Sequence, residues 1–200
     1  MNSTVSAQRG HDARGVANLM VRRAREMGVT VTNLALQKLV YFAHGWMLSR
    51  HGRPLVDGYF EAWQHGPVHP VLYANFKDHG RGTILSFAQK RDLMTGTISV
   101  AGEPTDPEAL EVIDRVLQAL GHQSTSQLVN LSHAKGGPWD EVVNKRPTET
   151  RLGLRIPDIL ISERYHRHMV MVGSEDRIGE IVDESPPARD RLGTDRAASN

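Results

Sequence analysis

Histidine is the residue type that first suggests chemistry in this chain, because ten histidines occur in 200 residues and imidazole can bind metal or transfer protons near neutral pH. His65 and His69 are four residues apart, which is the spacing of one helical face, but Gly66-Pro67 between them disfavours a regular helical turn. A zinc site also needs three or four protein ligands, and cysteine is absent. We therefore expect neither metal nor cofactor, with His65 and His69 in a loop and at a helix start.

His133 is the best candidate for a positioned histidine, because it ends a predicted short helix just before Gly136-Gly137. A protonated imidazole would suit the negative end of that helix and could bind its unpaired carbonyl groups. The adjacent Ser132 does not indicate a triad, since a nucleophile needs an activating base and a group that orients the base. Neither common glycine-rich phosphate-binding motif occurs. We expect a structural role for His133 and interpret the protein as a non-enzyme.

The main element that positions these residues is a predicted helix after Thr32, whose side chain can cap its first amide groups. Apolar residues then recur at spacings of three and four, which is typical of one buried helical face. They are Leu36, Leu39, Val40, Ala43, Trp46 and Met47. Glycine and proline in residues 51–54 and 57–58 indicate two turns after this helix.

A short strand is predicted over residues 59–63, and Gly66-Pro67 is expected to end it. Either Pro67 or Pro70 can occupy the first turn of the next helix, because a helix start does not need the amide that proline lacks. Tyr59, Trp63 and Tyr73 cluster at this junction. Such rings can fill the core, which is the interpretation we favour for Trp63, or face outward and anchor a partner.

Further along the chain, residues 83–87 and 97–100 are predicted to be two strands of a hairpin joined by the polar residues 89–92. Thr105 and Glu108 have the spacing of a capping box, and the helix that they begin is expected to end at Gly121.

The C-terminal half contains three more predicted helices. Ser124 or Ser126 can cap the first of them, residues 136–138 begin the second, and Pro157-Asp158 begins the third. The buried side of the third is expected to hold Ile156, Ile159, Leu160 and Met169. The predicted fold class is therefore mainly α with a small antiparallel β element, an α+β arrangement in one compact domain.

Several segments of the chain stand in an order and at spacings known from one protein family. They are residues 37–43 (QKLVYFA), 52–55 (GRPL), 60–63 (FEAW), 66–68 (GPV), Tyr73, Phe76, 131–133 (LSH) and 138–139 (PW). Through them, residues 16–143 resemble the Panacea-domain antitoxin family of the SocA type. The C-terminal segment offers nothing that we can match.

The resemblance implies an antitoxin that binds a cognate toxin protein and, in SocA-type members, acts as a proteolytic adaptor that delivers the toxin to the ClpXP protease. An adaptor needs one surface for the client and one for the protease, because tethering raises the effective concentration of the client. For the toxin-binding surface we expect His65, Pro67, His69, Tyr73 and Lys77. For the protease contact we expect one of the terminal segments.

Two other functions are compatible with the same resemblance. An antitoxin can neutralise its toxin by direct sequestration without degradation, or it can bind DNA and regulate its own operon. The net charge of +1 disfavours nucleic acid as a partner, because phosphate contacts need clustered basic residues. Arg22, Arg23 and Arg25 form a small basic group at best.

The composition predicts one domain, since 200 residues of which 39% are hydrophobic suffice for one well-buried core. We expect this domain to cover residues 16–173, between a flexible N-terminal segment, residues 1–15, and a disordered C-terminal tail, residues 174–200. Large apolar residues are almost absent from the end of the tail, and such a segment cannot offset the entropy of ordering. No apolar run has the length of a signal peptide or a membrane span, so we expect a cytoplasmic protein without membrane contact.

Overall fold

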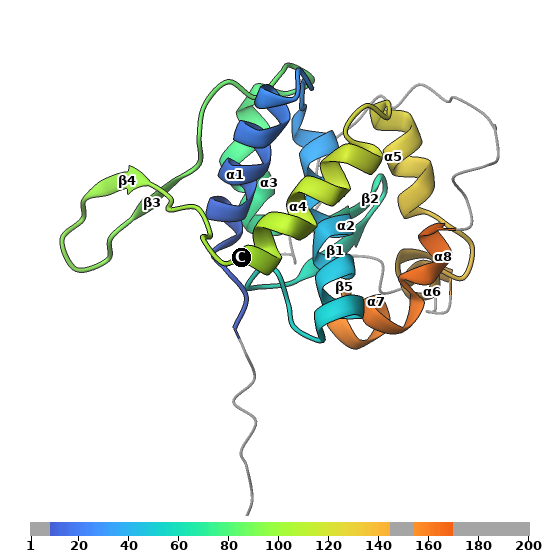
Figure 1. Cartoon of the computed structure of the whole chain (residues 1–200). Helices are drawn as coiled ribbons and strands as arrows, with labels where there is room; N and C mark the ends of the chain where they lie inside the picture. Colours follow the sequence, from blue (N-terminus) through green and yellow to red (C-terminus); the bar gives the residue numbers. More distant parts are fainter. Residues whose placement is uncertain (1–8, 145–153, 170–200) are drawn as a thin grey trace, which may run out of the picture.

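The computed structural model describes residues 9–144 and 154–169, and Figure 1 shows their arrangement. Most of the elements are helices. They are α1 (Ala13–Glu26), α2 (Asn33–His51), α3 (Pro70–Phe76), α4 (Pro107–Leu120), α5 (Thr125–Ser132), α6 (Pro138–Asn144), α7 (Asp158–Arg164) and α8 (His166–Met169), with a 3-10 turn η1 (Lys77–His79) after α3. Two small antiparallel sheets accompany them. The predicted fold class is confirmed.

Helix α2 occupies the centre of the molecule and contacts α1, α3, α4, α5, α7 and strand β2 (Gly66–Val68). It begins as predicted, because the hydroxyl of Thr32 accepts a hydrogen bond from the amide of Ala35 at 3.2 Å. It ends at Gly52, which adopts a φ of 66° that suits glycine. From Asn33 to Leu48 only Trp46 is partly exposed. The helix is therefore buried on all sides and not on one face alone.

A three-stranded antiparallel sheet packs against α2 in the order β2, β1 (Phe60–Trp63), β5 (Arg155–Ile156). The register pairs Glu61 with Val68 and Trp63 with Gly66. The prediction for Gly66-Pro67 was therefore incomplete, because these residues end β1 only by turning the chain into β2. Of the two candidate prolines, Pro70 begins α3.

The second sheet is a hairpin of β3 (Gln89–Arg91) and β4 (Ile98–Val100) that projects from the body of the molecule (Figure 1). The prediction was right for the second strand and wrong for the first. Residues 83–87 contain only an isolated bridge between Thr83 and Thr32, whereas residues expected to form the linker make the strand. Both strands are exposed, and β3 contains only polar residues, so no alternation of apolar and polar residues marks it.

The helices of the second half start close to the predicted positions. Asp106, and not Thr105, caps α4 by accepting a hydrogen bond from the amide of Ala109 at 2.9 Å. Ser124 and Gln127 form a capping box at the start of α5.

The predicted last helix is divided into α7 and α8. Ile156 lies in β5 and is buried, as expected, and Leu160 is partly buried. Ile159, however, is 68% exposed, and Ile161 is fully buried in its place. The side chain of Met169 lies outside the described residues.

The folded part of the chain starts before Val16, the predicted boundary. The amide of His11 donates to the carbonyl of Leu55 at 2.8 Å, and Asp12 caps α1. The predicted tail, residues 174–200, lies outside the described residues. Within the described ranges no helix is long and apolar enough to span a membrane.

The burial of α2 predicts the effect of shortening one of its side chains. Leu39 is 1% exposed, so Leu39→Ala should lower the free energy of unfolding by about 2 to 5 kcal/mol. Arg50→Ala, at an exposed position of the same helix, should change it by less than about 0.5 kcal/mol. Urea denaturation of both variants measures the difference, and equal losses would contradict the central position of α2.

Candidate partner-binding surface

A hollow lies where the start of α2 meets the β1–β2 hairpin and α3. Its empty space, including the open solvent above it, is about 330 Å³. The lining residues come from these three elements and combine aromatic rings with side-chain amides. They are Asn33, Leu34, Gln37, Trp63, Gln64, His65, Val68 and Tyr73. The hollow brings together two residues of the predicted toxin-binding set, His65 and Tyr73.

Polar side chains of α2 hold the hairpin in place beneath the hollow. The carbonyl oxygen of the Gln37 side chain accepts a hydrogen bond from the amide of His69 at 2.9 Å, and Gln37 also donates to Asn33 at 3.3 Å. Lys38 is fully buried, and its ammonium group donates to the carbonyl of Pro67 at 2.9 Å. Buried polar groups need such partners, so these bonds fix the hairpin relative to α2.

Two aromatic residues form one wall of the hollow. The rings of Trp63 and Tyr73 meet edge to face with their centroids 4.7 Å apart, an arrangement that aromatic pairs favour. The indole N–H of Trp63 donates to Glu61 at 2.8 Å, and that of Trp139 donates to the backbone carbonyl of Trp63 at 2.8 Å. Trp63 and Tyr73 are both half-buried. Trp63 therefore neither fills the core completely nor stands free of it.

The turn of the hairpin fits tightly against the end of α5. Gly66 has a φ of 93°, and a Cβ atom there would lie 2.4 Å from the hydroxyl oxygen of Ser132. That hydroxyl donates to the carbonyl of Val129 at 2.8 Å. Glycine is thus required at position 66 both by its backbone angle and by the space available. The role of Ser132 at this position is structural, because it packs against Gly66 and bonds to Val129.

His133 lies beside this contact, and its charge state differs from the prediction. Its ring stacks on Trp139 with centroids 3.8 Å apart and an angle of 17° between the planes. Burial, followed by the nearby charge of Lys38 and by His65, lowers the pKa of His133 to about 4. The imidazole is therefore neutral near pH 7 and not the protonated helix cap that the sequence suggested. Its structural role comes from stacking.

Two residues of the predicted toxin-binding set are internal. His69 is 1% exposed, lies 2.9 Å from the carbonyl oxygen of Asp57 and contacts the ring of Phe60 edge to face. Burial lowers the pKa of His69. Pro67 is also buried. Both residues are buried in this structure, so neither presents its side chain at the surface.

The other three residues of that set remain accessible. His65 and Tyr73 are half-buried at the hollow, and Lys77 is exposed on η1, directly after α3. Five lining residues were not predicted as site residues, namely Asn33, Leu34, Gln37, Gln64 and Val68. The sequence contained one indication of this site, because Gln37 and Lys38 are polar residues within a largely apolar helix and therefore need polar partners. Within the described ranges no group of three or more histidine, aspartate or glutamate residues could hold a metal ion.

The basic residues of α1 make internal contacts. The guanidinium of Arg22 pairs with Glu103 at 2.8 Å and with Glu26 at 2.7 Å, while Arg23 lies 3.5 Å from Asp114. Arg25 donates to the carbonyl of Ile84 at 2.9 Å and stacks on the ring of Phe87. Carboxylates thus balance much of this charge, which weakens the case for a phosphate-binding surface.

Comparison with known proteins identifies the family. The domain described as "Antitoxin SocA-like, Panacea domain" matches residues 36–140, just over half of the chain. This chain belongs to the SocA-like Panacea antitoxin family. It is 46% identical to "Antitoxin SocA" of Caulobacter vibrioides (strain NA1000 / CB15N) over 177 residues, which are 88% of this chain and 94% of the relative. No solved structure matches.

The Panacea domain match includes most of the hollow. It begins at Leu36, so it contains Gln37, the β1–β2 hairpin and Tyr73, together with the Ser132–Trp139 region that packs against the hairpin. Helix α1 and the first turn of α2, with Asn33 and Leu34, precede it. In this antitoxin the hollow is therefore built mainly, but not entirely, from the matched region.

The neutral state of His133 predicts a dependence of stability on pH. An unfolded chain takes up a proton on this histidine below its ordinary pKa of 6.5, whereas the folded protein resists protonation until about pH 4. The free energy of unfolding should therefore decrease as pH falls from 6.5 to 4, with a contribution from His133 of up to about 3 kcal/mol. His69, whose pKa is also lowered, acts in the same direction.

His133→Phe tests this contribution, because phenylalanine can keep the stacking on Trp139 and does not titrate. Denaturant unfolding between pH 6.5 and 4.5 should show a smaller loss of stability for the variant than for the parent. An NMR titration that placed the pKa of His133 near 6.5 would contradict the buried, neutral imidazole.

Proposed function

We propose that this protein is an antitoxin that binds its cognate toxin protein and acts as a proteolytic adaptor, delivering the toxin to the ClpXP protease. The observation that carries this proposal is the 46% identity to a relative named Antitoxin SocA over almost the whole of both chains. An adaptor performs no chemistry of its own, since it acts by holding a client near the protease. We accordingly propose a non-enzymatic role.

The hollow is the surface on which we propose that the toxin binds. The rings of Trp63 and Tyr73 provide apolar contact area, and the exposed amide of Gln64 provides hydrogen-bonding groups beside it. Partner anchors typically enter such partly apolar depressions, and tyrosine and tryptophan contribute strongly to binding. The bonds from Gln37 and Lys38 to the hairpin hold this surface in shape before the toxin arrives, which reduces the entropic cost of binding.

Tyr73→Ala and Lys77→Glu test the toxin surface. We expect each to weaken binding of the purified toxin at least about tenfold, because tyrosine anchors and charges near an interface commonly contribute this much. Lys135→Glu is the matched charge control, since Lys135 is also exposed but lies between α5 and α6. Calorimetry gives the affinities, and thermal unfolding shows that the variants fold. Unchanged affinity in folded Tyr73→Ala and Lys77→Glu would remove the hollow as the toxin site.

Direct sequestration is the principal alternative, because it would use the same toxin surface. The two mechanisms differ in the fate of the toxin. A DNA-binding operon regulator is less well supported, since the charges of α1 are paired with Glu26, Glu103 and Asp114.

The half-life of the toxin in cells separates adaptor from sequestering antitoxin. We expect the toxin encoded beside this chain to disappear rapidly only when both this protein and active ClpXP are present. Depleting either should lengthen the half-life several-fold. A toxin that stays abundant but harmless in a complex with this protein would show sequestration instead.

A further inference from the structure

The β3–β4 hairpin carries the two most exposed of the large apolar side chains in the described ranges, Leu93 and Met94. We call residues 89–100 the arm. At its tip Leu93 and Met94 are 96% and 94% exposed, and on β4 Ile98 and Val100 are 62% and 54% exposed. A two-stranded hairpin is only marginally stable by itself in water. Exposed apolar residues concentrated on such an element indicate a contact surface.

A buried side chain of α1 clamps the root of the arm. The amide nitrogen of Asn18 donates to the carbonyls of Ala88 and Ala101, each at 3.0 Å, and its oxygen accepts from the amide of Ala88 at 2.7 Å. Asn18, Ala88 and Ala101 are all at most 3% exposed. The fold therefore fixes both ends of the arm with buried hydrogen bonds, while the arm itself contributes no buried side chain to the core.

The turn of the arm is also ordered by specific bonds. The carboxylate of Asp92 accepts hydrogen bonds from the amides of Met94 and Thr95 at 2.8 and 2.9 Å. Gly96, with a φ of 73°, completes the turn. In this turn the side chains of Leu93 and Met94 point into solvent and not toward the body of the molecule. An ordered turn that presents two apolar side chains favours recognition by a partner.

The charge of the arm indicates the character of that partner. Lys90 and Arg91 are exposed. The charge of Lys90 acts on the carboxylates of Asp12 and Asp92, and Asp92 is also bonded within the turn. In the β3–β4 register Arg91 lies opposite Ile98 and Gln89 opposite Val100, so Arg91 shares one face of the hairpin with two aliphatic residues. The complementary surface is an apolar groove bordered by carboxylates. A second copy of the arm would bring like charges together.

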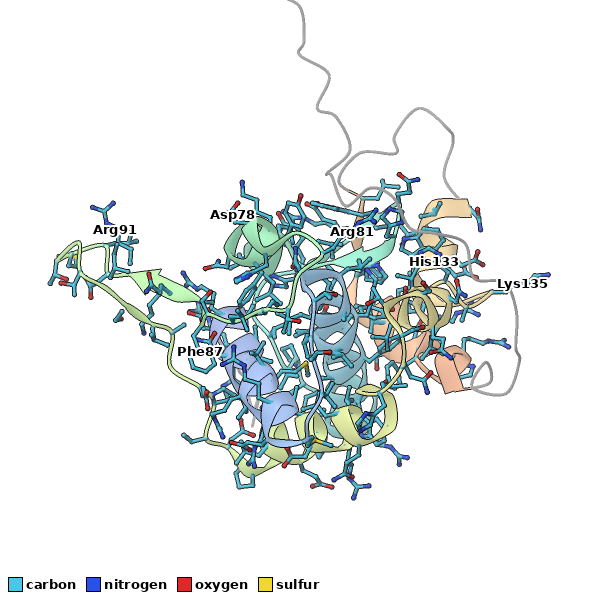
Figure 2. All side chains as sticks on the ribbon, turned by 90° about the horizontal axis from the view of Figure 1, so that it is seen from above. Asp78, Arg81, Phe87, Arg91, His133 and Lys135 are labelled. Carbon is cyan, nitrogen blue, oxygen red and sulfur yellow. The ribbon has the colours of Figure 1, made fainter. Side chains whose placement is uncertain are left out.

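The arm and the hollow are built from different parts of the chain. The arm projects at the end of the molecule opposite α5 and α6, and Figure 2 shows Arg91 and Lys135 at opposite ends. The hollow is formed by α2, α3 and the β1–β2 hairpin, so the two surfaces share no residue. An adaptor needs two such surfaces, one for each partner.

We propose that the arm, and not a terminal segment, docks this antitoxin on the unfoldase component of the protease, in an apolar groove bordered by carboxylates, while the hollow holds the toxin. This inference rests on the proposed adaptor function. The edges of β3 and β4 also allow strand addition to a partner sheet. The arm then serves as the tether, and its clamped root sets the direction in which the toxin is presented.

The test uses the full-length protein with two arm variants, Leu93→Asp combined with Met94→Asp, and Lys90→Glu combined with Arg91→Glu. Binding of purified ClpX and of purified toxin is measured separately for each by biolayer interferometry. We expect each arm variant to lose at least about tenfold in affinity for ClpX and to bind the toxin within twofold of the parent. Degradation of the toxin in a reconstituted ClpXP reaction should slow in parallel.

Ile159→Asp is the matched control, because Ile159 is 68% exposed on α7 and lies outside both the arm and the hollow. It should bind ClpX as the parent does. A second route avoids the arm residues altogether: Asn18→Ala removes the clamp and should weaken ClpX binding in protein that remains folded by circular dichroism. If Asn18→Ala unfolds, the surface variants decide the question alone.

Several results would overturn the assignment. The first is an unchanged affinity for ClpX in both arm variants, and the second is an equal loss of ClpX affinity in Ile159→Asp. The third is a loss of toxin affinity in the arm variants, which would make the arm part of the client surface. Failure of the adaptor function itself is distinct, because the unmodified protein would then not accelerate toxin degradation at all. If the parent accelerates degradation and the arm variants do so equally, only the arm assignment fails.

Discussion

Burying α2 on nearly all sides forces every polar group that this helix carries to find a partner within the protein. Gln37 holds the backbone of His69, Lys38 holds that of Pro67, and His44 contacts Asp158 of α7 at 3.1 Å. Each bond joins α2 to a segment far away in the sequence. Because an unsatisfied buried polar group is costly, these contacts specify which neighbour lies where, and apolar packing alone would specify this less strictly. The bonds of Gln37 and Lys38 also fix the shape of the hollow at the start of α2, because they hold the β1–β2 hairpin against the helix.

The elements that the sequence predicts well are those marked by local signals. Thr32, Pro70 and Ser124 begin helices for reasons contained in a few neighbouring residues. The errors concern signals that depend on distant parts of the chain. Gly66-Pro67 resembles a stop but pairs with β1, and the polar residues of β3 resemble a linker because both faces of that strand are exposed. Strand pairing is not encoded in local composition.

The candidate site could be predicted as a region but not as a surface. The sequence indicates that residues 59–77 contain aromatic and imidazole groups, yet it does not show which of them point inward. The ring of His69 contacts the carbonyl of Asp57, and its backbone amide donates to the side chain of Gln37. Both partners lie in other elements, and these contacts hold His69 inward. His133 was expected to be charged because its position at a helix end is visible in the sequence. The burial of its ring and the nearby charge of Lys38, which make protonation unfavourable, are not visible there.

The clamp at Asn18 has a consequence for how this family can vary. Because Ala88 and Ala101 are joined by a backbone hydrogen bond of 3.0 Å and held together by one side chain, the chain between them leaves and re-enters the core at a single point. An excursion of this kind can be lengthened, shortened or exchanged without moving α2 or its neighbours. The same junction offers engineers a place to graft a foreign hairpin, and evolution a place to change partners while the core remains the same.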